Sequence, residues 1–266
     1  MPQIQTASDI IAFFKDYDLS FSTQNYLKFH ALRYLILWQK VTVILDDMLE
    51  NTLEAVQNEP SSNQKLQILD IGPGLFTELL GQFYPDLEIH TLGLNAAYFD
   101  LKTKLIFHKY DLNQLYLEPD SSVALTQNLP KFDLILYCEV LEHLYTGPQA
   151  SFDFLYQHLK SYGSLLIQTP NAVSLHHRLF MLTGKNPFPL LRPDPNEPGH
   201  YREYTQNELV KMLKNSDFEI GQIEFHDYFN YAGNWKNRIY KFCNKFWPTT
   251  FRDGITVVVN KNRTRL

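Results

Sequence analysis

The chain contains 266 residues, of which 44% are apolar and 20% are charged, and this globular balance excludes an intrinsically disordered protein. The length suits one large domain with an N-terminal extension better than two independent cores. The formal net charge is −5, whereas a protein held to duplex DNA by its phosphates would carry a strongly basic face. The composition therefore disfavours a nucleic-acid partner.

Cysteine content and the N-terminal sequence bear on the compartment. The two cysteines, Cys138 and Cys243, are too few for a disulfide framework or a cysteine metal cluster. The first 15 residues are polar at the start and do not form a basic and then apolar signal. An apolar stretch at residues 34–38 is broken by Gln39 and Lys40 and is too short to span a bilayer. We expect a cytoplasmic protein without a transmembrane segment.

Residues 1–64 predict an N-terminal helical extension. Apolar residues recur at helical spacing over residues 8–57, which indicates two or three amphipathic helices. The spacing is clearest in two groups: Ile10, Ile11, Phe13 and Phe14, and then Leu35, Leu37, Val41, Ile44, Leu45, Met48 and Leu49. A polar stretch at residues 58–64, which includes Pro60, ends the extension like a linker.

Residues 65–266 predict one α/β domain, because short strand-like runs alternate with helical ones. Nearly continuous apolar runs are typical of strands buried on both faces, and the alternation implies right-handed crossovers and a parallel sheet. The predicted strands are residues 66–71, 87–92, 104–107, 132–137, 164–168, 218–225 and 255–259, with helices at residues 77–83, 208–214 and 235–246.

A long irregular stretch at residues 171–199 follows the fifth predicted strand. Its segments 186–189 and 192–195 each contain two prolines, which cannot continue a helix or a central strand. A loop of this length inside a compact domain is usually a lid or a binding loop. We therefore predict a lid over residues 171–199.

Two glycines follow the first predicted strand and precede a helix. The segment Asp70-Ile71-Gly72-Pro73-Gly74 lies where ligands bind in open α/β sheets, beyond the strand ends, and glycine lets a ligand approach the backbone. The alternative is a glycine-rich turn without a ligand, and a lone G-x-G leaves both interpretations open.

An acidic pair and a histidine follow the fourth predicted strand. Glu139, Glu142 and His143 are spaced i, i+3, i+4, so on a starting helix their side chains would share one face. Such a group can bind a divalent cation or tune the histidine as a general base. The alternative is that Glu142 pairs locally and His143 only packs at the pocket floor.

The order of these landmarks over residues 66–225 resembles the class I S-adenosylmethionine-dependent methyltransferases, most closely the branch containing the ubiquinone-biosynthesis O-methyltransferases. The resemblance implies a Rossmann-like, seven-stranded, mostly parallel sheet with helices on both faces and an antiparallel last strand. It also implies that S-adenosylmethionine binds at the strand ends. The cofactor-binding residues that it implies are Asp70, Gly72, Gly74, Asn95, Asp111, Leu112, Cys138 and Arg33.

Individual positions carry individual roles in this resemblance. Asp70 matches the acidic residue at the amino-acid end of the cofactor, and Asp111 matches the one that contacts the adenine amino group. Asn95 stands where an acid normally holds the ribose hydroxyls. Arg33 could reach the cofactor carboxylate from the N-terminal helices, although a surface arginine is the commoner case.

A second histidine follows the predicted lid, in the segment Gly199-His200-Tyr201-Arg202-Glu203. It resembles a segment of the ubiquinone-type enzymes and of the small-RNA 2′-O-methyltransferases, in which a Glu-x-x-Glu-His cluster and a distant His bind Mg²⁺. Glu139, Glu142, His143 and His200 match that quartet. A bound cation would lower the pKa of the acceptor hydroxyl, and without metal His200 or His143 could take the proton.

We therefore expect methyl transfer from S-adenosylmethionine, with Mg²⁺ as the candidate ion at the quartet, to a hydroxyl oxygen of a small molecule such as a sugar, a quinone or a lipid-like compound. Three alternatives stay open: an RNA 2′-O-methyltransferase, a dinucleotide-dependent oxidoreductase, and a non-catalytic protein that retains the fold. Thr77 stands where the oxidoreductase motif needs glycine. Phe76, where the family often has a third glycine, and Asn95 motivate the non-catalytic alternative. The acceptor and the oligomeric state are open.

Overall fold

A seven-stranded sheet forms the centre of the protein in a computed structural model that describes residues 3–58, 65–94, 100–118, 129–194, 198–229 and 246–261. The strand order is β3-β2-β1-β4-β5-β7-β6. The strands are β1 (Gln67–Ile71), β2 (Glu88–Gly93), β3 (Ile106–Lys109), β4 (Phe132–Cys138), β5 (Leu159–Pro170), β6 (Phe218–His226) and β7 (Gly254–Lys261).

Strand directions confirm the predicted fold class. The pairs β1–β2, β1–β4, β2–β3 and β4–β5 are parallel, while β7 runs antiparallel to both β5 and β6. The last strand is therefore the antiparallel one, and the two late strands pair as neighbours, as predicted. The order reverses between β1 and β4, so the crevice beyond their carboxyl ends is where an open α/β sheet binds its ligands.

The starts of two strands differ from the prediction by two residues or more. β3 begins two residues later than expected. β5 begins five residues earlier, at Leu159, which pairs with Phe132. An irregularity that includes Tyr162, with a φ of +67°, separates this pair from the regular ladder that begins at Ser164. Residues 160–163 are mostly polar and include Gly163, so they lack the apolar pattern from which a buried strand is predicted. The sequence therefore predicted this strand only from Ser164 onward.

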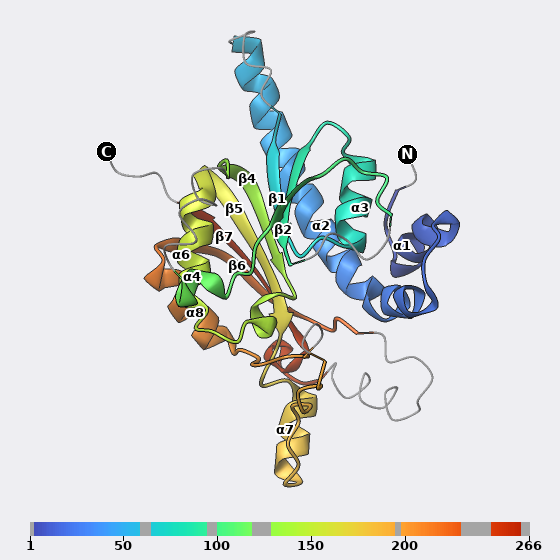
Figure 1. Cartoon of the computed structure of the whole chain (residues 1–266), viewed down its shortest axis with the longest axis vertical. Coiled ribbons are helices and arrows are strands. Elements are labelled where there is room, and N and C mark those ends of the chain that lie inside the picture. Colours follow the sequence, from blue (N-terminus) through green and yellow to red (C-terminus); the bar gives the residue numbers. More distant parts are fainter. Residues whose placement is uncertain are drawn as a thin grey trace.

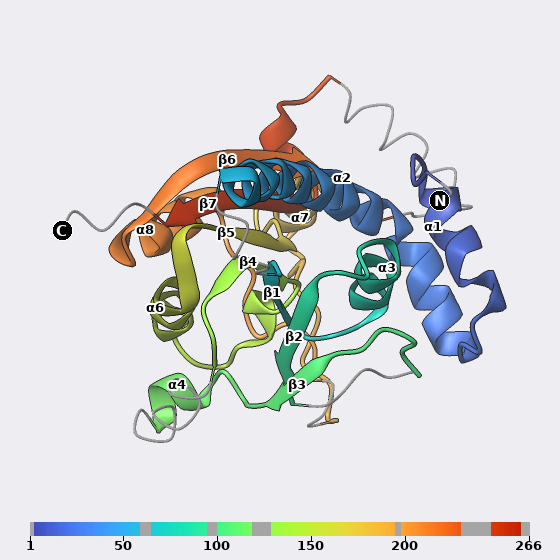
Figure 2. The ribbon, with the colours of Figure 1, turned by 90° about the horizontal axis from the view of Figure 1, so that it is seen from above.

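Helices cover both faces of the sheet (Figure 2). The helices are α1 (Ala7–Phe13), α2 (Phe21–Asn58), α3 (Leu75–Phe83), α4 (Gln114–Leu117), α6 (Gln149–His158), α7 (Leu175–Leu182) and α8 (Gln206–Asn215), with 3₁₀ turns η1 (Phe14–Asp16), η3 (Leu141–His143) and η4 (Thr249–Phe251). Alternate residues of β4 enter two cores: Leu134 and Leu136 pack with α2 and α3, and Ile135 and Tyr137 pack on the other face with α6 and α8.

The long helix α2 lies against the sheet rather than away from it. Leu37, Val41 and Leu45, spaced four residues apart, are almost completely buried in the core that α2 shares with α3. At the sheet edge, Lys40 Nζ lies 2.7 Å from Glu224 Oε1 on β6. This packing brings the start of α2 to the carboxyl ends of the strands, where its side chains can contribute to a site.

The predicted lid contains a helix, which corrects the expectation of an irregular stretch. Ser174 caps the start of α7 by accepting a hydrogen bond from the His177 amide, and Gly184 ends it at a φ of +73°. These capping residues allow eight helical residues before the first proline. Figure 1 shows α7 projecting from the body of the protein.

Several predictions fall outside the described residues: most of the linker at residues 58–64, Asn95, Cys243, and the helix at residues 235–246 except for its last residue. Within the described part of the chain, no helix is both long enough and apolar enough to cross a membrane.

Candidate functional site

The turn after β1 leaves open space beside its backbone. Gly72 has a φ of +79°, which favours glycine, and its amide donates to the Leu92 carbonyl at 2.8 Å. Gly74 is extended, and a Cβ added to it would meet no atom within 4 Å. A side chain there would enter the space beyond the strand ends, so Gly74 keeps this part of the crevice free for a ligand.

Asp70 lies buried at the end of β1 beneath this turn. Its Oδ2 accepts a hydrogen bond from Thr77 Oγ1 at 2.6 Å, and the same Thr77 oxygen accepts one from the Gly74 amide at 2.8 Å. Burial raises the pKa of Asp70 to about 7, against the opposing effects of Thr77 and of the Arg33 guanidinium. The carboxyl is thus short of cationic partners and suits a ligand that brings an ammonium group.

Phe76 does not obstruct the turn. Its side chain is buried in the core and its ring stacks on that of Tyr34 from α2, with the centroids 6.2 Å apart. The position where the family often has glycine therefore faces the helix layer rather than the crevice. This removes one of the two sequence arguments for a decayed site, while Asn95, the other, lies outside the described residues.

Arg33 is buried rather than on the surface. The guanidinium Nη1 lies 3.9 Å from Glu139 Oε2, Nη2 donates to the Tyr26 hydroxyl at 3.3 Å, and Nε has no hydrogen-bond partner among the described residues. Burial works against the charge, but Glu139 and the tyrosine hydroxyls raise the pKa of Arg33 above its usual value. A buried cation with an unused donor is suited to hold a ligand carboxylate.

The remaining predicted cofactor residues occupy different environments. Asp111 follows β3 and its Oδ1 accepts two hydrogen bonds from Asn113, at 2.9 Å each, while Leu112 is buried in the core. Cys138 ends β4 half-buried, and burial together with Asp70 raises the pKa of its thiol well above the usual value. The raised pKa keeps the thiol protonated at neutral pH, and a protonated thiol is a poor nucleophile.

Glu139 departs from the predicted helical face. Its φ of +56° is left-handed, and only residues 141–143 form a helical turn, of the 3₁₀ type. The Glu139 amide continues the ladder by donating to Gln168 O at 2.7 Å, and its carboxylate faces Arg33. Glu139 therefore pairs with Arg33 and is not part of the group that Glu142, His143 and His200 form. The i, i+3, i+4 argument presupposed an α-helix that does not begin there.

Glu142, His143 and His200 do come together. One ligand atom from each lies within 4.8 Å of those of the others, and the two imidazole rings are 5.0 Å apart at 85°. The backbone explains how distant segments meet, because the Tyr201 amide donates to the Glu142 carbonyl at 2.8 Å. Glu142 is fully buried, and burial and Glu139 raise its pKa well above the usual value. Its Oε2 accepts from Thr169 Oγ1, and Oε1 has no hydrogen-bond partner in the described part of the chain.

Both histidines are oriented through Nδ1. His143 Nδ1 lies 3.0 Å from the Gly199 carbonyl, which fixes Nδ1 as the donor and leaves Nε2 as the acceptor. His200 Nδ1 lies 3.0 Å from Glu203 Oε1. The His143 ring is partly exposed, but burial of the rest of the ring and the nearby His200 lower the pKa of His143. Both rings can therefore present a lone pair at Nε2.

Two residues of this site were not predicted. Glu203 is almost completely buried and contacts His200 and, at 3.6 Å, His177 Nδ1. His30 on α2 packs against the rings of Tyr26, at 4.0 Å, and Phe229, at 5.4 Å. Its Nδ1 is buried with no hydrogen-bond partner among the residues that the structure describes, and burial, then Arg33, then His200 lower its pKa to about 3.

A sequence signal existed for each of them. Glu203 lies three residues after His200, the spacing of one helical turn. Tyr26, His30 and Arg33 recur at i, i+4, i+7, which places them on one face of a helix. These spacings do not show that the side chains of Glu203, His30 and Arg33 are buried, which only the structure reveals.

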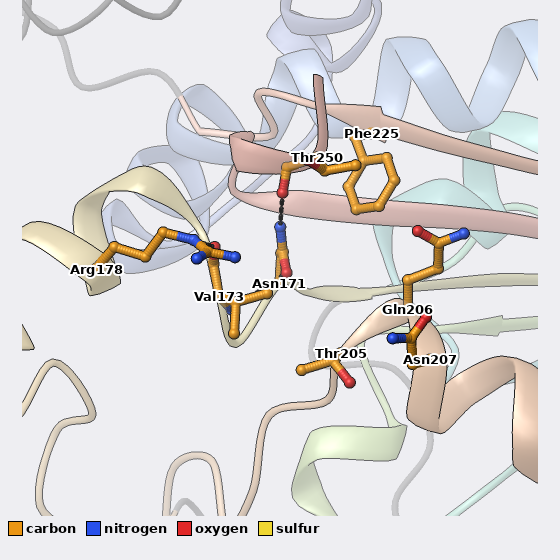
Figure 3. Close-up of a pocket in the computed structure, with 8 residues that line it drawn as sticks. All are labelled: Asn171, Val173, Arg178, Thr205, Gln206, Asn207, Phe225 and Thr250. Carbon is orange, nitrogen blue, oxygen red and sulfur yellow. Dashed lines mark hydrogen bonds between the residues drawn. The ribbon is translucent and has the colours of Figure 1, made fainter. Parts of the chain in front are cut away.

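A cavity of about 290 Å³ opens at the base of the lid (Figure 3). Arg178, Thr205 and Phe225 line it, and Asn171 Nδ2 donates to the Thr250 carbonyl across its wall at 2.9 Å. No histidine of the cluster lines this cavity. It is therefore a neighbour of the candidate site and not the site itself.

Comparison with known proteins gives one match of sequence. A family model described as "Methyltransferase domain" matches residues 43–223. No curated protein matches this chain.

Solved structures with a similar fold include a SAM-dependent methyltransferase from Archaeoglobus fulgidus (17% identity, 81% of this chain and 94% of that chain covered, TM-score 0.48). Another is a SAM-dependent methyltransferase from Methanosarcina mazei (17%, 76% and 94%, TM-score 0.46). A third is the N-methyltransferase NodS from Bradyrhizobium japonicum with S-adenosyl-L-homocysteine (13%, 80% and 87%, TM-score 0.43). Because these identities are below 25% and the TM-scores are below 0.5, family membership rests on the family model alone.

Proposed function

Because this chain belongs to the methyltransferase-domain family and is an S-adenosylmethionine-dependent methyltransferase, we propose that it methylates a hydroxyl oxygen of a small molecule, with His200 as the general base. The observation that carries the proposal is the Glu203–His200 hydrogen bond of 3.0 Å, next to His143 at the sheet edge that holds the glycine turn. A carboxylate on one imidazole nitrogen leaves the other free to take a proton.

The residues present fit the cofactor. The open space beside Gly74, the unused Nε of Arg33 and the buried Asp70 provide room, a cation for a carboxylate and an anion for an ammonium group. When bound, S-adenosylmethionine supplies the electrophilic methyl group of its sulfonium. Asp111 and Asn95 are proposed for its adenosine part, and Cys138 and Leu112 for apolar contact.

The chain's own residues account for the proton. His200 Nε2 accepts the hydroxyl proton, and Glu203 stabilises the imidazolium that forms. His143, held by the Gly199 carbonyl, offers a second acceptor that orients the hydroxyl hydrogen. His30 and Tyr26 form a wall from α2 at which a planar or apolar part of the acceptor can rest. Positioning of the oxygen beside the methyl carbon then supplies much of the rate.

A divalent cation at Glu142, His143 and His200 is the second candidate for the same role, favoured by the unpartnered Oε1 of Glu142 and the proximity of the three groups. One carboxylate and two imidazoles are a softer donor set than Mg²⁺ selects, and they suit a borderline ion such as Mn²⁺ or Zn²⁺ better. Glu139, predicted as a fourth ligand, faces Arg33 instead. Treatment with EDTA separates the two versions: a histidine base keeps its activity, whereas a cation-dependent enzyme loses it until the ion is returned.

The test uses the full chain with radiolabelled S-adenosylmethionine and a panel of hydroxyl acceptors, namely sugars, phenols and hydroxylated lipids. His200→Ala and Glu203→Gln should lower kcat by about 100-fold or more while leaving the Kd for S-adenosylhomocysteine unchanged. Tyr201→Phe, at an exposed neighbour of His200, is the matched control and should retain activity. Absence of S-adenosylmethionine binding by the wild-type protein would support the non-catalytic alternative. Methylation of RNA, with no small acceptor used, would support the RNA 2′-O-methyltransferase alternative.

A further inference from the structure

Residues 175–194, here called the α7 projection, extend from the body of the protein as a helix and a returning segment (Figure 1). The turn between the two has a defined conformation. The Lys185 amide donates to the Phe180 carbonyl at 3.1 Å and the Gly184 amide to the Met181 carbonyl at 2.9 Å, the paired hydrogen bonds of a helix ended by a left-handed glycine. The backbone at this end therefore has a defined conformation.

Apolar side chains of the α7 projection face water. Leu182 is 83% exposed and Leu190 is 92% exposed, and they are accompanied by Leu179, Met181 and Leu191, each exposed by about half. A folded domain seldom leaves so many large apolar side chains together on one exposed element. Exposed apolar surface of this kind commonly marks a site where another molecule binds.

The apolar surface continues to the base of the projection. Arg178 places its guanidinium 4.6 Å above the ring of Phe251, and Phe251 stacks on Trp247 with the centroids 5.4 Å apart. Trp247 is half exposed. A tryptophan beside an arginine at the border of an apolar surface is the combination found where proteins meet the headgroup region of a bilayer.

The charge of the α7 projection is opposite to that of the chain. It carries Arg178, Lys185 and Arg192 against a single acid, Asp194, in a chain with a net charge of −5. A cationic rim around inserted apolar side chains is attracted to anionic lipid headgroups. A fluid bilayer also accepts a convex tip without a preformed groove, whereas a protein partner would need a matching concave surface.

We propose that the α7 projection docks the protein on an anionic lipid surface, with Leu182 and Leu190 among the acyl chains and Lys185 and Arg192 at the headgroups. This docking goes beyond the methyl transfer proposed above and needs neither cofactor nor acceptor. It would place the end of β5 at Pro170, just before the projection, close to the membrane surface.

The test is co-sedimentation of the full chain with vesicles. Binding is expected to vesicles of equal parts phosphatidylglycerol and phosphatidylcholine, to be weak for phosphatidylcholine alone, and to fall as salt is added. Leu182→Glu and Leu190→Glu should each lower the affinity by about tenfold or more, and Lys185→Gln and Arg192→Gln by about fivefold each. Val43→Glu, at a 69% exposed apolar position on α2, is the matched control and should bind like wild type.

Three outcomes overturn the proposal. The first is equal binding of Leu182→Glu and wild type to the phosphatidylglycerol vesicles. The second is no binding of wild type to any vesicle. The third is self-association of wild type in sedimentation velocity that Leu182→Glu abolishes without any vesicle binding, which would make the projection an interface between copies of the chain. S-adenosylhomocysteine binding by each variant shows that it is folded, so that failure of lipid binding stays separate from failure of the proposed enzyme activity.

Discussion

The buried Asp70 should make the stability of the cofactor-free protein fall as pH rises. Its pKa is about 7 in the folded protein, against 3.8 as the ordinary value in an unfolded chain. Because the folded state binds this proton more tightly, the stability that Asp70 contributes is complete below pH 3.8 and is lost as pH rises through about 7. Between about pH 5 and about pH 8 the loss amounts to about 2.5 kcal/mol of unfolding free energy.

Asp70→Asn isolates this contribution. The amide oxygen of the replacement side chain can still accept the hydrogen bond from Thr77, but the side chain no longer titrates. Asp253, whose pKa burial also raises to about 7, adds a loss in the same pH range to both proteins and cancels in the difference.

Urea unfolding of wild type and Asp70→Asn at pH 5, 6, 7 and 8 measures the effect. The free energy of unfolding should decline more steeply for wild type, so that the difference between the proteins changes by about 2.5 kcal/mol across the range. Parallel curves would refute the reasoning, because they would mean that Asp70 titrates near its ordinary pKa and is well compensated in its site.

Further predictions concern three other positions. Gly74→Val should abolish S-adenosylhomocysteine binding in calorimetry without lowering Tm, whereas Gly147→Val, which also adds a side chain in open space, should leave binding intact. Phe76→Ala should destabilise the fold by about 3–5 kcal/mol in urea unfolding and should not improve cofactor affinity, since the ring lies in the core. Gly254→Ala should cost about 1–3 kcal/mol and lower Tm, because the new Cβ would lie 2.2 Å from the ring of Tyr228. An unchanged Tm for Gly254→Ala would contradict the packing around β7.

The sheet was predictable because its strands have recognisable local patterns. Strand β4 is apolar on both faces, and the glycine turn after β1 marks the strand end, so the strand positions and the mostly parallel sheet followed from the sequence. The antiparallel direction of β7 was expected from the family resemblance. The lid helix α7 was missed because its caps, Ser174 and Gly184, stand among prolines that suggested an irregular chain. The capping residues stabilise a helix at residues 175–182 even though the proline content of residues 171–199 predicts irregular structure.

The candidate site was harder to predict because it depends on contacts between distant segments. His200 meets His143 through the backbone bond from Tyr201 to Glu142, which no spacing rule encodes. Glu139 has a left-handed backbone, which turns its side chain out of the group that a helix would have created. Burial of Arg33 likewise follows from how α2 lies on the sheet and not from the residues around it.

The projecting segment leaves and rejoins the domain at one point. Asn171 and Tyr204 form a parallel bridge, and the Ala172 amide donates to the Tyr204 carbonyl at 3.2 Å. With its two ends joined in this way, the α7 projection within the intervening chain can lengthen, shorten or change composition at a small cost in loop entropy and without moving the sheet, as long as the segment from Gly199 to Glu203 is kept. An enzyme with this layout can acquire a new range of acceptors through changes in the α7 projection alone, while the proposed cofactor-binding residues at the strand ends stay unchanged.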